Sequence, residues 1–241
     1  MKPALTIIVP AFNEAATLPG VVTSLLSLPL DGGHEVIVVD DGSEDATLDS
    51  LLHIKDRRLR ILTHSTNRGK GAAVLTALTE AKGNYTLIFD GDLEYDVEDV
   101  ISLYREALQR HWPFIMGSRT FGSHTAYSFW YVIGNRVTTL FVNVLFNSYI
   151  TDLHSCLKMV DTRIFRELTL SEQRFGLDVE LVCELLRRGY RPFEMPISYK
   201  ARTREEGKKI TARDGINSIY VAARVRLRRK VQRGGPQPDQ T

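Results

Sequence analysis

The chain has 241 residues, of which 43% are hydrophobic and 25% charged, and its formal net charge is +2. This composition excludes a disordered chain, and the length fits one α/β domain with an appendage. No run approaches the roughly 18 uninterrupted apolar residues of a spanning helix, and the N-terminal apolar run stops at Pro10, which disfavours a signal peptide. Cys156 and Cys183 lack CxxC partners, which is typical of buried free thiols in a reducing cytosol.

The small net charge conceals a strongly basic C-terminal end. Residues 200–233 hold twelve Lys or Arg and three acids, a surplus of nine positive charges. Because the whole chain carries +2, the remaining residues together carry −7. A basic end on an acidic body indicates an anionic partner, which can be a nucleic acid, a membrane surface or a phosphorylated ligand.

The first ninety residues alternate strand and helix patterns. Short apolar runs predict strands over Leu5–Val9, Glu35–Asp41, Arg60–Thr63 and Tyr85–Phe89. Apolar residues at helical spacing predict helices over residues 15–28, Asp45–Ile54 and Lys70–Ala81. The repeated units predict an α/β fold, with a mostly parallel central sheet flanked by helices and joined by right-handed crossovers.

Polar clusters follow three of these strands. Ligands of a parallel sheet bind beyond the carboxyl ends of its strands, so Pro10–Glu14, Asp40–Ser43 and Asp90–Glu94 are expected to meet. In the last cluster, Asp90 and Asp92 alternate along an extended segment, so both carboxylates can reach one divalent cation. Glu94 continues that spacing. Solvated loop acids are the alternative, but the position directly after an apolar strand favours a metal site.

The other polar segments are less specific. Asp40–Ser43 can accept hydrogen bonds from a base or a ribose, or can cap the next helix. Asn67–Gly71 matches neither the dinucleotide fingerprint nor the P-loop, and indicates a turn with an anion-friendly helix start. Arg119 and the block Arg202–Lys209 can neutralise a diphosphate or remain solvated. The six histidines lack metal-ligand spacing and are expected at the surface.

The second half of the chain is less regular. It contains a predicted helix over Val97–Gln109, a strand over Phe114–Gly117, a loop over Phe121–Ser128, a helix over residues 177–188 and a strand over Ile197–Tyr199. A helix over residues 214–230 is expected to have Ile216, Ile219, Tyr220 and Ala223 on one side. The apolar stretch Val137–Phe146 is interpreted as a core helix or as a segment that dips into a bilayer interface.

Several motifs, taken in order, carry a resemblance to a known family. They are IIVPAFNEAATL, VIVVDDGSEDAT, NRGKGAAVLTAL, GNYTLIFDGDLEYDVEDV, GSRTFG, TDLHSCLKMV and RFGLDVELVCELLRRGYRPFEMPISYKARTREEGKKI. Over about residues 4–220 the chain resembles family 2 glycosyltransferases, and more closely the polyprenol- and dolichyl-phosphate sugar synthases. The resemblance implies a GT-A-type fold, a nucleotide-diphosphate sugar donor and a divalent cation, Mg²⁺ or Mn²⁺. We accordingly expect a glycosyltransferase domain at 1–213, a basic helix at 214–233 and a disordered tail at 234–241.

By position, the resemblance implies roles for individual residues. Those expected to bind the nucleotide sugar are Pro10, Phe12, Glu14, Val39, Asp41, Asp90, Gly91, Asp92, Arg119, Arg202, Lys208 and Lys209. Those expected to be catalytic are Asp92, Arg119 and Arg202, and those expected to hold the metal are Asp90, Asp92 and Glu94. The acceptor is expected to lie near Arg136, Asp152, Lys158, Asp178 and Glu180. The sequence departs from the family pattern at Phe12, where Tyr is more usual, and at Glu94, where the mannose synthases often have Gln. Lys208 is an alternative to Lys209, because the spacing from Arg202 is one residue longer than in the mannose synthases.

The implied reaction is transfer of a hexose-type sugar from a UDP- or GDP-sugar to a polyprenyl monophosphate, with inversion at the anomeric carbon. A phosphate nucleophile is already anionic and needs no strong general base. The alternative is a hydroxyl acceptor, which requires a carboxylate base such as Asp152, Asp178 or Glu180. A sugar-1-phosphate nucleotidyltransferase is disfavoured, because no Gly-rich, Arg-containing loop follows the first strand.

The basic end is expected to serve as a membrane contact. With the stretch Val137–Phe146, the cations of 224–233 would dock on anionic lipid, at about 1 kcal/mol per basic residue near the surface. The expected location is therefore peripheral, at the cytoplasmic face of a membrane, with a membrane-protein partner as a further possibility. A nucleic-acid partner is not expected, because the acidic strand ends would repel a phosphate backbone.

Overall fold

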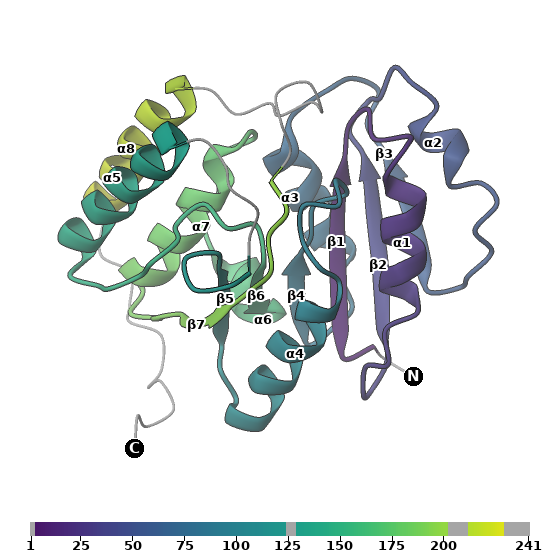
Figure 1. Ribbon diagram of the computed structural model, residues 1–241, viewed down its shortest axis with the longest axis horizontal. Coiled ribbons are helices and arrows are strands. Elements are labelled where there is room, and N and C mark those ends of the chain that lie inside the picture. Colours follow the sequence, from purple (N-terminus) through teal and green to yellow (C-terminus); the bar gives the residue numbers. More distant parts are fainter. Residues whose placement is uncertain (1–2, 124–128, 202–211, 229–241) are drawn as a thin grey trace.

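The computed structural model describes residues 3–123, 129–201 and 212–228 of the chain. At its centre is a seven-stranded sheet in the order β3-β2-β1-β4-β6-β5-β7 (Figure 1). The strands are β1 (Leu5–Ala11), β2 (His34–Asp40), β3 (Leu59–Thr63), β4 (Tyr85–Ile88), β5 (Phe114–Ser118), β6 (Lys158–Asp161) and β7 (Phe193–Pro196). β6 pairs antiparallel with β4 and β5, and the other pairings are parallel. The predicted mostly parallel α/β sheet is confirmed.

The order of the strands creates a switch point at the centre of the sheet. From β1 the chain moves to β2 and β3 on one side, and it then crosses back to β4 on the other side of β1. The register pairs Pro10 with Val39 and Ile8 with Ile88, so the carboxyl ends of β1, β2 and β4 lie at one edge. Open α/β sheets bind ligands at such a point.

Helices flank this sheet, and their bounds follow the apolar periodicity of the sequence. They are α1 (Leu18–Leu26), α2 (Thr47–Ser50), α3 (Lys70–Glu80), α4 (Glu98–Arg110), α5 (Phe129–Phe146), α6 (Thr162–Glu167), α7 (Gly176–Arg187) and α8 (Ala212–Leu227). α5, α7 and α8 gather beside the β7 end of the sheet, on the left of Figure 1, and pack on one another. α1 and α2 lie beside the opposite end.

The core consists of the central strands and the inner faces of the helices. Leu5, Ile7, Ile8 and Val9 of β1 are fully buried, as are Val36 to Val39 of β2. Continuous apolar runs of this kind are typical of parallel strands covered on both faces. Cys156 and Cys183 are buried free thiols, as predicted.

The structure adds three elements that the sequence pattern did not predict, which are β6, α6 and β7. β6 begins with a fully buried lysine, Lys158, and ends with Asp161, so it lacks the apolar ends of a typical strand signal. Asp161 caps α6, because its carboxylate accepts hydrogen bonds from the backbone N–H groups of Arg163 (2.9 Å) and Ile164 (3.2 Å). The strand predicted over Ile197–Tyr199 is instead a loop with one isolated bridge, between Tyr95 and Tyr199.

The two outer helices each bury one face and expose an apolar one. In the stretch Val137–Phe146 of α5, Thr138, Thr139 and Val142 are buried, whereas Leu140 and Val144 are 63% and 77% exposed. The core interpretation therefore holds for one face of this stretch only. α5 also has the length and apolar composition of a membrane-crossing helix, which the sequence reading had excluded; such a property by itself is weak evidence of a span.

In α8, the buried face is not the side on which Ile216, Ile219, Tyr220 and Ala223 lie. Val221, Ala222 and Val225 are fully buried, because these side chains pack toward α5 and α7. Ile216 and Tyr220, which were expected on one side of the helix, are 72% and 62% exposed, so that side faces outward. The spacing of apolar residues therefore located the helix, but two apolar stripes competed for the interior.

Candidate functional site

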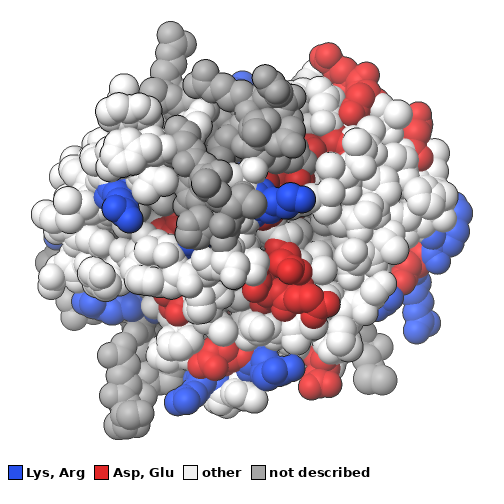
Figure 2. All heavy atoms as spheres, viewed as in Figure 1, with Lys and Arg blue, Asp and Glu red and all other residues white. Residues whose placement is uncertain are grey.

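The candidate site lies at the switch point, where the polar clusters after β1, β2 and β4 meet as predicted. Acidic side chains gather near the middle of this face, close to the end of β4 and the start of α4 (Figure 2). Phe12 and Glu14 are partly buried beside the end of β1, and Val39 is fully buried in β2. The loop after β1 is tied to the loop after β2, since the backbone N–H of Asn13 donates to Ser43 Oγ (2.9 Å).

Asp41 has a structural role at this edge. Its carboxylate accepts hydrogen bonds from the backbone N–H groups of Gly69 (2.6 Å) and Arg68 (3.0 Å), and it pairs with His64 Nδ1 at 2.6 Å. The side chain is almost completely buried and holds the turn that starts α3. The sequence did not reveal this use, because the partners lie more than twenty residues away. A nucleoside contact for Asp41 stays a prediction.

The acidic segment after β4 is a turn, whereas the alternation of Asp90 and Asp92 predicted an extended segment. The residue Leu93 adopts φ +60°, the left-handed region, which is uncommon for a non-glycine residue and recurs at functional sites. Thr17 of the first loop donates to the carbonyl oxygen of Gly91 (2.8 Å), and the backbone N–H of Glu94 donates to Asp92 Oδ1 (3.2 Å). The first contact ties the turn to the start of α1, and the second lies within the turn itself.

Lys70, at the first residue of α3, is a site residue that the sequence reading missed. Its Nζ lies 2.9 Å from Asp90 Oδ1, 3.2 Å from Asp178 Oδ2 and 3.3 Å from Cys156 Sγ. Burial lowers the pKa of Lys70, but the charges of Asp178 and Asp90 outweigh it, so the pKa lies well above the ordinary value. The signal was the GKG sequence before an Ala-rich helix, which had been interpreted only as a helix start.

Arg119, after β5, is held from two sides. Its Nε and Nη2 donate to the two carboxylate oxygens of Asp152, each at 2.7 Å. The guanidinium carbon lies 4.8 Å from the ring centre of Tyr199. Burial raises the pKa of Asp152, but the charge and hydrogen bonds of Arg119 outweigh it, so that pKa lies well below its usual range. A bidentate pair of this kind fixes the orientation of the guanidinium.

The five residues predicted to surround the acceptor do not form one group. Asp152 pairs with Arg119, and Asp178 lies between Lys70 and the fully buried Lys158, at 3.2 Å from each nitrogen. Arg136 is exposed on α5. Glu180 faces away from this group, toward α8. Its acceptor role, like those of the other four, stays a prediction.

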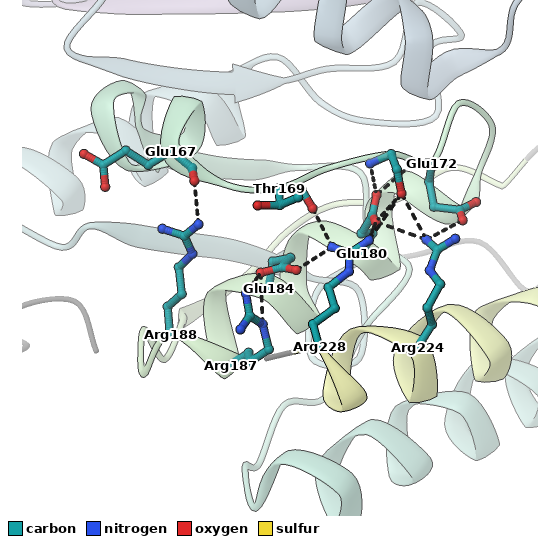
Figure 3. Close-up of polar contacts among 10 residues, drawn as sticks. Glu167, Thr169, Glu172, Glu180, Glu184, Arg187, Arg188, Arg224 and Arg228 are labelled. Carbon is teal, nitrogen blue, oxygen red and sulfur yellow. Dashed lines mark hydrogen bonds and ion pairs between the residues drawn. The ribbon is translucent and has the colours of Figure 1, made fainter. Parts of the chain in front are cut away.

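Glu180 belongs instead to a buried ion network between α7 and α8 (Figure 3). Its Oε1 lies 2.7 Å from Arg228 and 3.1 Å from Arg224, and Glu184 Oε1 lies 2.5 Å from Arg228. Both carboxylates are fully buried. Arg224 and Arg228, which were predicted to contact a membrane, therefore point inward. The linear sequence contains no pattern that predicts these partners. Arg202, Lys208 and Lys209 lie outside the described residues.

The described residues contain no group of three or more His, Cys, Asp or Glu side chains placed to hold a metal ion by themselves. Two of the three predicted carboxylates have other partners: Asp90 pairs with Lys70, and Glu94 Oε2 accepts a hydrogen bond from the Tyr199 hydroxyl (2.7 Å). Among the described histidines, His53 and His111 are exposed as expected, and others differ. His34 and His64 are largely buried, and burial lowers the pKa of His154 to about 4.

A mostly parallel sheet with a polar switch point defines a class shared with solved glycosyltransferases of the GT-A type. Glucosyl-3-phosphoglycerate synthase from Mycobacterium tuberculosis, in complex with Mn²⁺, UDP-glucose and phosphoglyceric acid, superposes with a TM-score of 0.72 at 18% identity, over 93% of this chain and 80% of that one. The model of glycosyl transferase family 2 matches residues 6–169, so the chain belongs to this family and is a glycosyltransferase.

Three curated relatives extend the comparison. Glycosyltransferase AglJ of Haloferax volcanii is 26% identical over 83% of this chain and 64% of its own length. The dolichol-phosphate mannosyltransferase of Saccharomyces cerevisiae is 35% identical over 47% of this chain and 44% of its own length. The dodecaprenyl-phosphate galacturonate synthase of Rhizobium johnstonii is 33% identical over 48% of this chain and 36% of its own length. The aligned part of this chain thus spans less than two thirds of each relative.

Proposed function

We propose that the chain transfers a hexose-type sugar from a UDP- or GDP-sugar to a polyprenyl monophosphate. The observation that carries the proposal is the juxtaposition, at the switch point, of the acidic turn Asp90–Glu94 with the oriented guanidinium of Arg119. Such a pair of charges matches a donor whose diphosphate reaches the protein with a cation. Two relatives, a dolichol-phosphate mannosyltransferase and a dodecaprenyl-phosphate galacturonate synthase, support the acceptor class by their names.

The donor atoms at the acidic turn fit a divalent cation that is shared with substrate. Mg²⁺ is usually held by one or two carboxylates and completes its coordination with substrate phosphates and water, so a closed protein site is not required. Asp92 and Glu94, with Asp90 beside them, would supply the carboxylates. When bound, Mg²⁺ or Mn²⁺ would supply positive charge to the departing diphosphate.

The protein's own residues would orient and neutralise the two substrates. Lys70 holds the Asp90 carboxylate, and Asp152 fixes the guanidinium of Arg119 so that its remaining N–H groups can meet a phosphate. Arg202 and either Lys208 or Lys209 are proposed as further cations for the diphosphate. In-line attack by the acceptor phosphate would invert the anomeric carbon, and the charge that develops on the leaving group would be stabilised by these cations.

The electrostatics of the site favour a phosphate acceptor over a hydroxyl acceptor. A hydroxyl needs a carboxylate base whose pKa lies near neutrality. For Asp152, Asp178 and Glu180, burial raises each pKa, but the neighbouring cations and hydrogen-bond donors outweigh it and the net shift is downward. Three ion-paired carboxylates of low basicity are poor bases, whereas a lipid monophosphate needs none.

The location that we propose is peripheral, at the cytoplasmic face of a membrane. The supporting observation is the outward apolar face of α5, where Trp130, Leu140 and Val144 are each more than 60% exposed. Exposed apolar side chains on a helix of this length suit contact with the acyl boundary of a bilayer. Since Arg224 and Arg228 are used inside the protein, the apolar face would carry more of this contact than the basic helix.

The test is release of nucleoside diphosphate from a panel of UDP- and GDP-sugars, with Mg²⁺ or Mn²⁺ and a short polyprenyl phosphate. Each assay is paired with the corresponding unphosphorylated prenol. Release that requires both the metal and the acceptor phosphate supports the proposal. Equal release of nucleoside diphosphate when the prenol replaces the polyprenyl phosphate would favour the hydroxyl acceptor instead.

A further inference from the structure

Tyr199 joins three parts of the site that are far apart in the sequence. It lies after β7, and its backbone N–H donates to the carbonyl oxygen of Ser123 (2.8 Å). The next N–H, of Lys200, donates to the carbonyl oxygen of Glu94 (2.8 Å). With the bridge to Tyr95, the backbone at Tyr199 is thus fixed against the acidic turn on one side and the loop after β5 on the other.

The side chain makes two functionally different contacts. Its hydroxyl donates a hydrogen bond of 2.7 Å to Glu94 Oε2, and the guanidinium of Arg119 lies over its ring at 4.8 Å. The ring also packs on Tyr95, with ring centres 5.3 Å apart and planes tilted by 55°. Tyr199 is only 4% exposed, so its ring cannot turn away without disturbing its neighbours.

The guanidinium of Arg119 is therefore held in two ways: Asp152 accepts hydrogen bonds at its edge, and the ring of Tyr199 packs against its face. Asp152 is in turn fixed by the amide of Asn135 on α5, which donates to its Oδ1 at 2.9 Å. A continuous line of contacts runs from α5 to the acidic turn. Three of its links are hydrogen bonds of 2.7–2.9 Å, and the fourth is the contact of the Arg119 guanidinium with the Tyr199 ring. Linked contacts of this kind hold catalytic groups in one geometry.

The chemistry of these contacts explains why a tyrosine suits this position. A carboxylate and a guanidinium in a partly desolvated site attract each other strongly and would form an ion pair. Such a pair would use the oxygens and N–H groups that are needed for a cation and a phosphate. A tyrosine can satisfy one carboxylate oxygen with a neutral hydroxyl and one guanidinium face with its ring, and it leaves both charges in place.

We propose that Tyr199 is a positioning residue that holds Glu94 and Arg119 apart and fixes each for its ligand. The inference rests on the proposed function, because it takes Glu94 to be at the cation and Arg119 at the donor diphosphate. It assigns the two parts of Tyr199 to two ligands: the hydroxyl to cation binding and the ring to diphosphate binding.

Two variants of the full chain separate these parts. Tyr199→Phe keeps the ring, and it is expected to weaken Mn²⁺ binding in the presence of UDP or GDP about tenfold, as measured by electron paramagnetic resonance, with the donor KM within about twofold. Tyr199→Leu removes the ring as well, and is expected to raise the donor KM a further three- to fivefold, or about 0.6–1 kcal/mol. Tyr149→Phe, at an 84% exposed tyrosine after α5, is the matched control and should change neither quantity.

A double variant guards against a purely structural effect. In the background of Glu94→Ala, the Tyr199→Phe change should have no further effect on Mn²⁺ binding, because the acceptor of the hydroxyl is absent. Equal Mn²⁺ affinity in the wild type and Tyr199→Phe would overturn the inference while the proposed function stands. A wild-type chain that neither binds Mn²⁺ with a nucleoside diphosphate nor releases one from any donor would overturn the proposed function itself.

Discussion

Arg228 offers a direct test of how α8 is held to the rest of the protein. Its Nη2 lies 2.7 Å from Glu180 Oε1, and its Nη1 lies 2.5 Å from Glu184 Oε1 and 2.5 Å from the carbonyl oxygen of Thr169 (Figure 3). The change Arg228→Met keeps an apolar stem of similar length but removes the charge. Two fully buried carboxylates then lose a cation.

The size of the expected loss in stability depends on the contacts that Glu180 and Glu184 keep in the variant. Removing one partner of a buried ion pair costs about 3–5 kcal/mol when the other charge is left alone. Here Glu180 keeps the backbone N–H groups of Ser171 (2.7 Å) and Glu172 (2.8 Å), and Glu184 keeps Arg187 (2.7 Å). The side chain of Arg228 is also 23% exposed, so part of its interaction is screened. We therefore expect a loss of about 2–3 kcal/mol in the free energy of unfolding, which for a domain of this size lowers Tm by about 5–10 °C.

The assay is urea and thermal unfolding of the two variants Arg228→Met and Arg226→Met beside the wild type. Arg226 is the matched control, since it lies on the same helix but is exposed, and its described contact is one hydrogen bond to the carbonyl oxygen of Leu145 (3.0 Å). Its replacement should change the free energy by less than about 1 kcal/mol. A Tm for Arg228→Met that matches that of the control would refute the role given to the network.

Three further predictions concern the site, the pH dependence and the surface. Asp92→Ala should abolish metal-dependent donor binding and reduce transfer by at least about a hundredfold, with an unchanged Tm, in binding and turnover assays. Because the pKa of His154 is about 4 in the folded protein and about 6.5 when unfolded, the unfolded chain binds more protons between these values, so stability should fall by up to about 2 kcal/mol from pH 7 to pH 5. His154→Gln should remove that part of the pH dependence in urea titrations. Replacing exposed Leu140 and Val144 by Gln should reduce sedimentation with anionic vesicles without lowering Tm, and unchanged sedimentation would exclude α5 as the contact.

The first half of the fold could be predicted because its signals are local. Four apolar runs and three amphipathic segments each lie within about 14 residues, and the alternation of strands and helices predicts that the strands run parallel. The positions of Asp90 and Asp92 at a carboxyl edge follow from the same pattern. Strands such as β6 could not be predicted, because Lys158 is fully buried and its ammonium pairs with Asp178, 20 residues away in the chain.

The roles of several site residues depend on contacts that no spacing encodes. Lys70 and Tyr199 lie in ordinary sequence contexts, and each becomes informative only when chain segments 20 to 108 residues away are brought beside it. The same holds for Arg224 and Arg228, whose charge indicated a surface but whose partners lie on α7. The charge count predicts that basic residues cluster in this part of the chain. It does not predict which acidic side chain each of them contacts.

The central claim is tested most directly by the transfer reaction itself. The purified chain is incubated with UDP- and GDP-sugars, Mg²⁺ or Mn²⁺ and a short polyprenyl phosphate, and the release of nucleoside diphosphate is measured with and without each component. The proposed function predicts that at least one donor gives release, and that this release is lost when the metal is chelated or when the polyprenyl phosphate is replaced by its prenol. No release with any donor would contradict it.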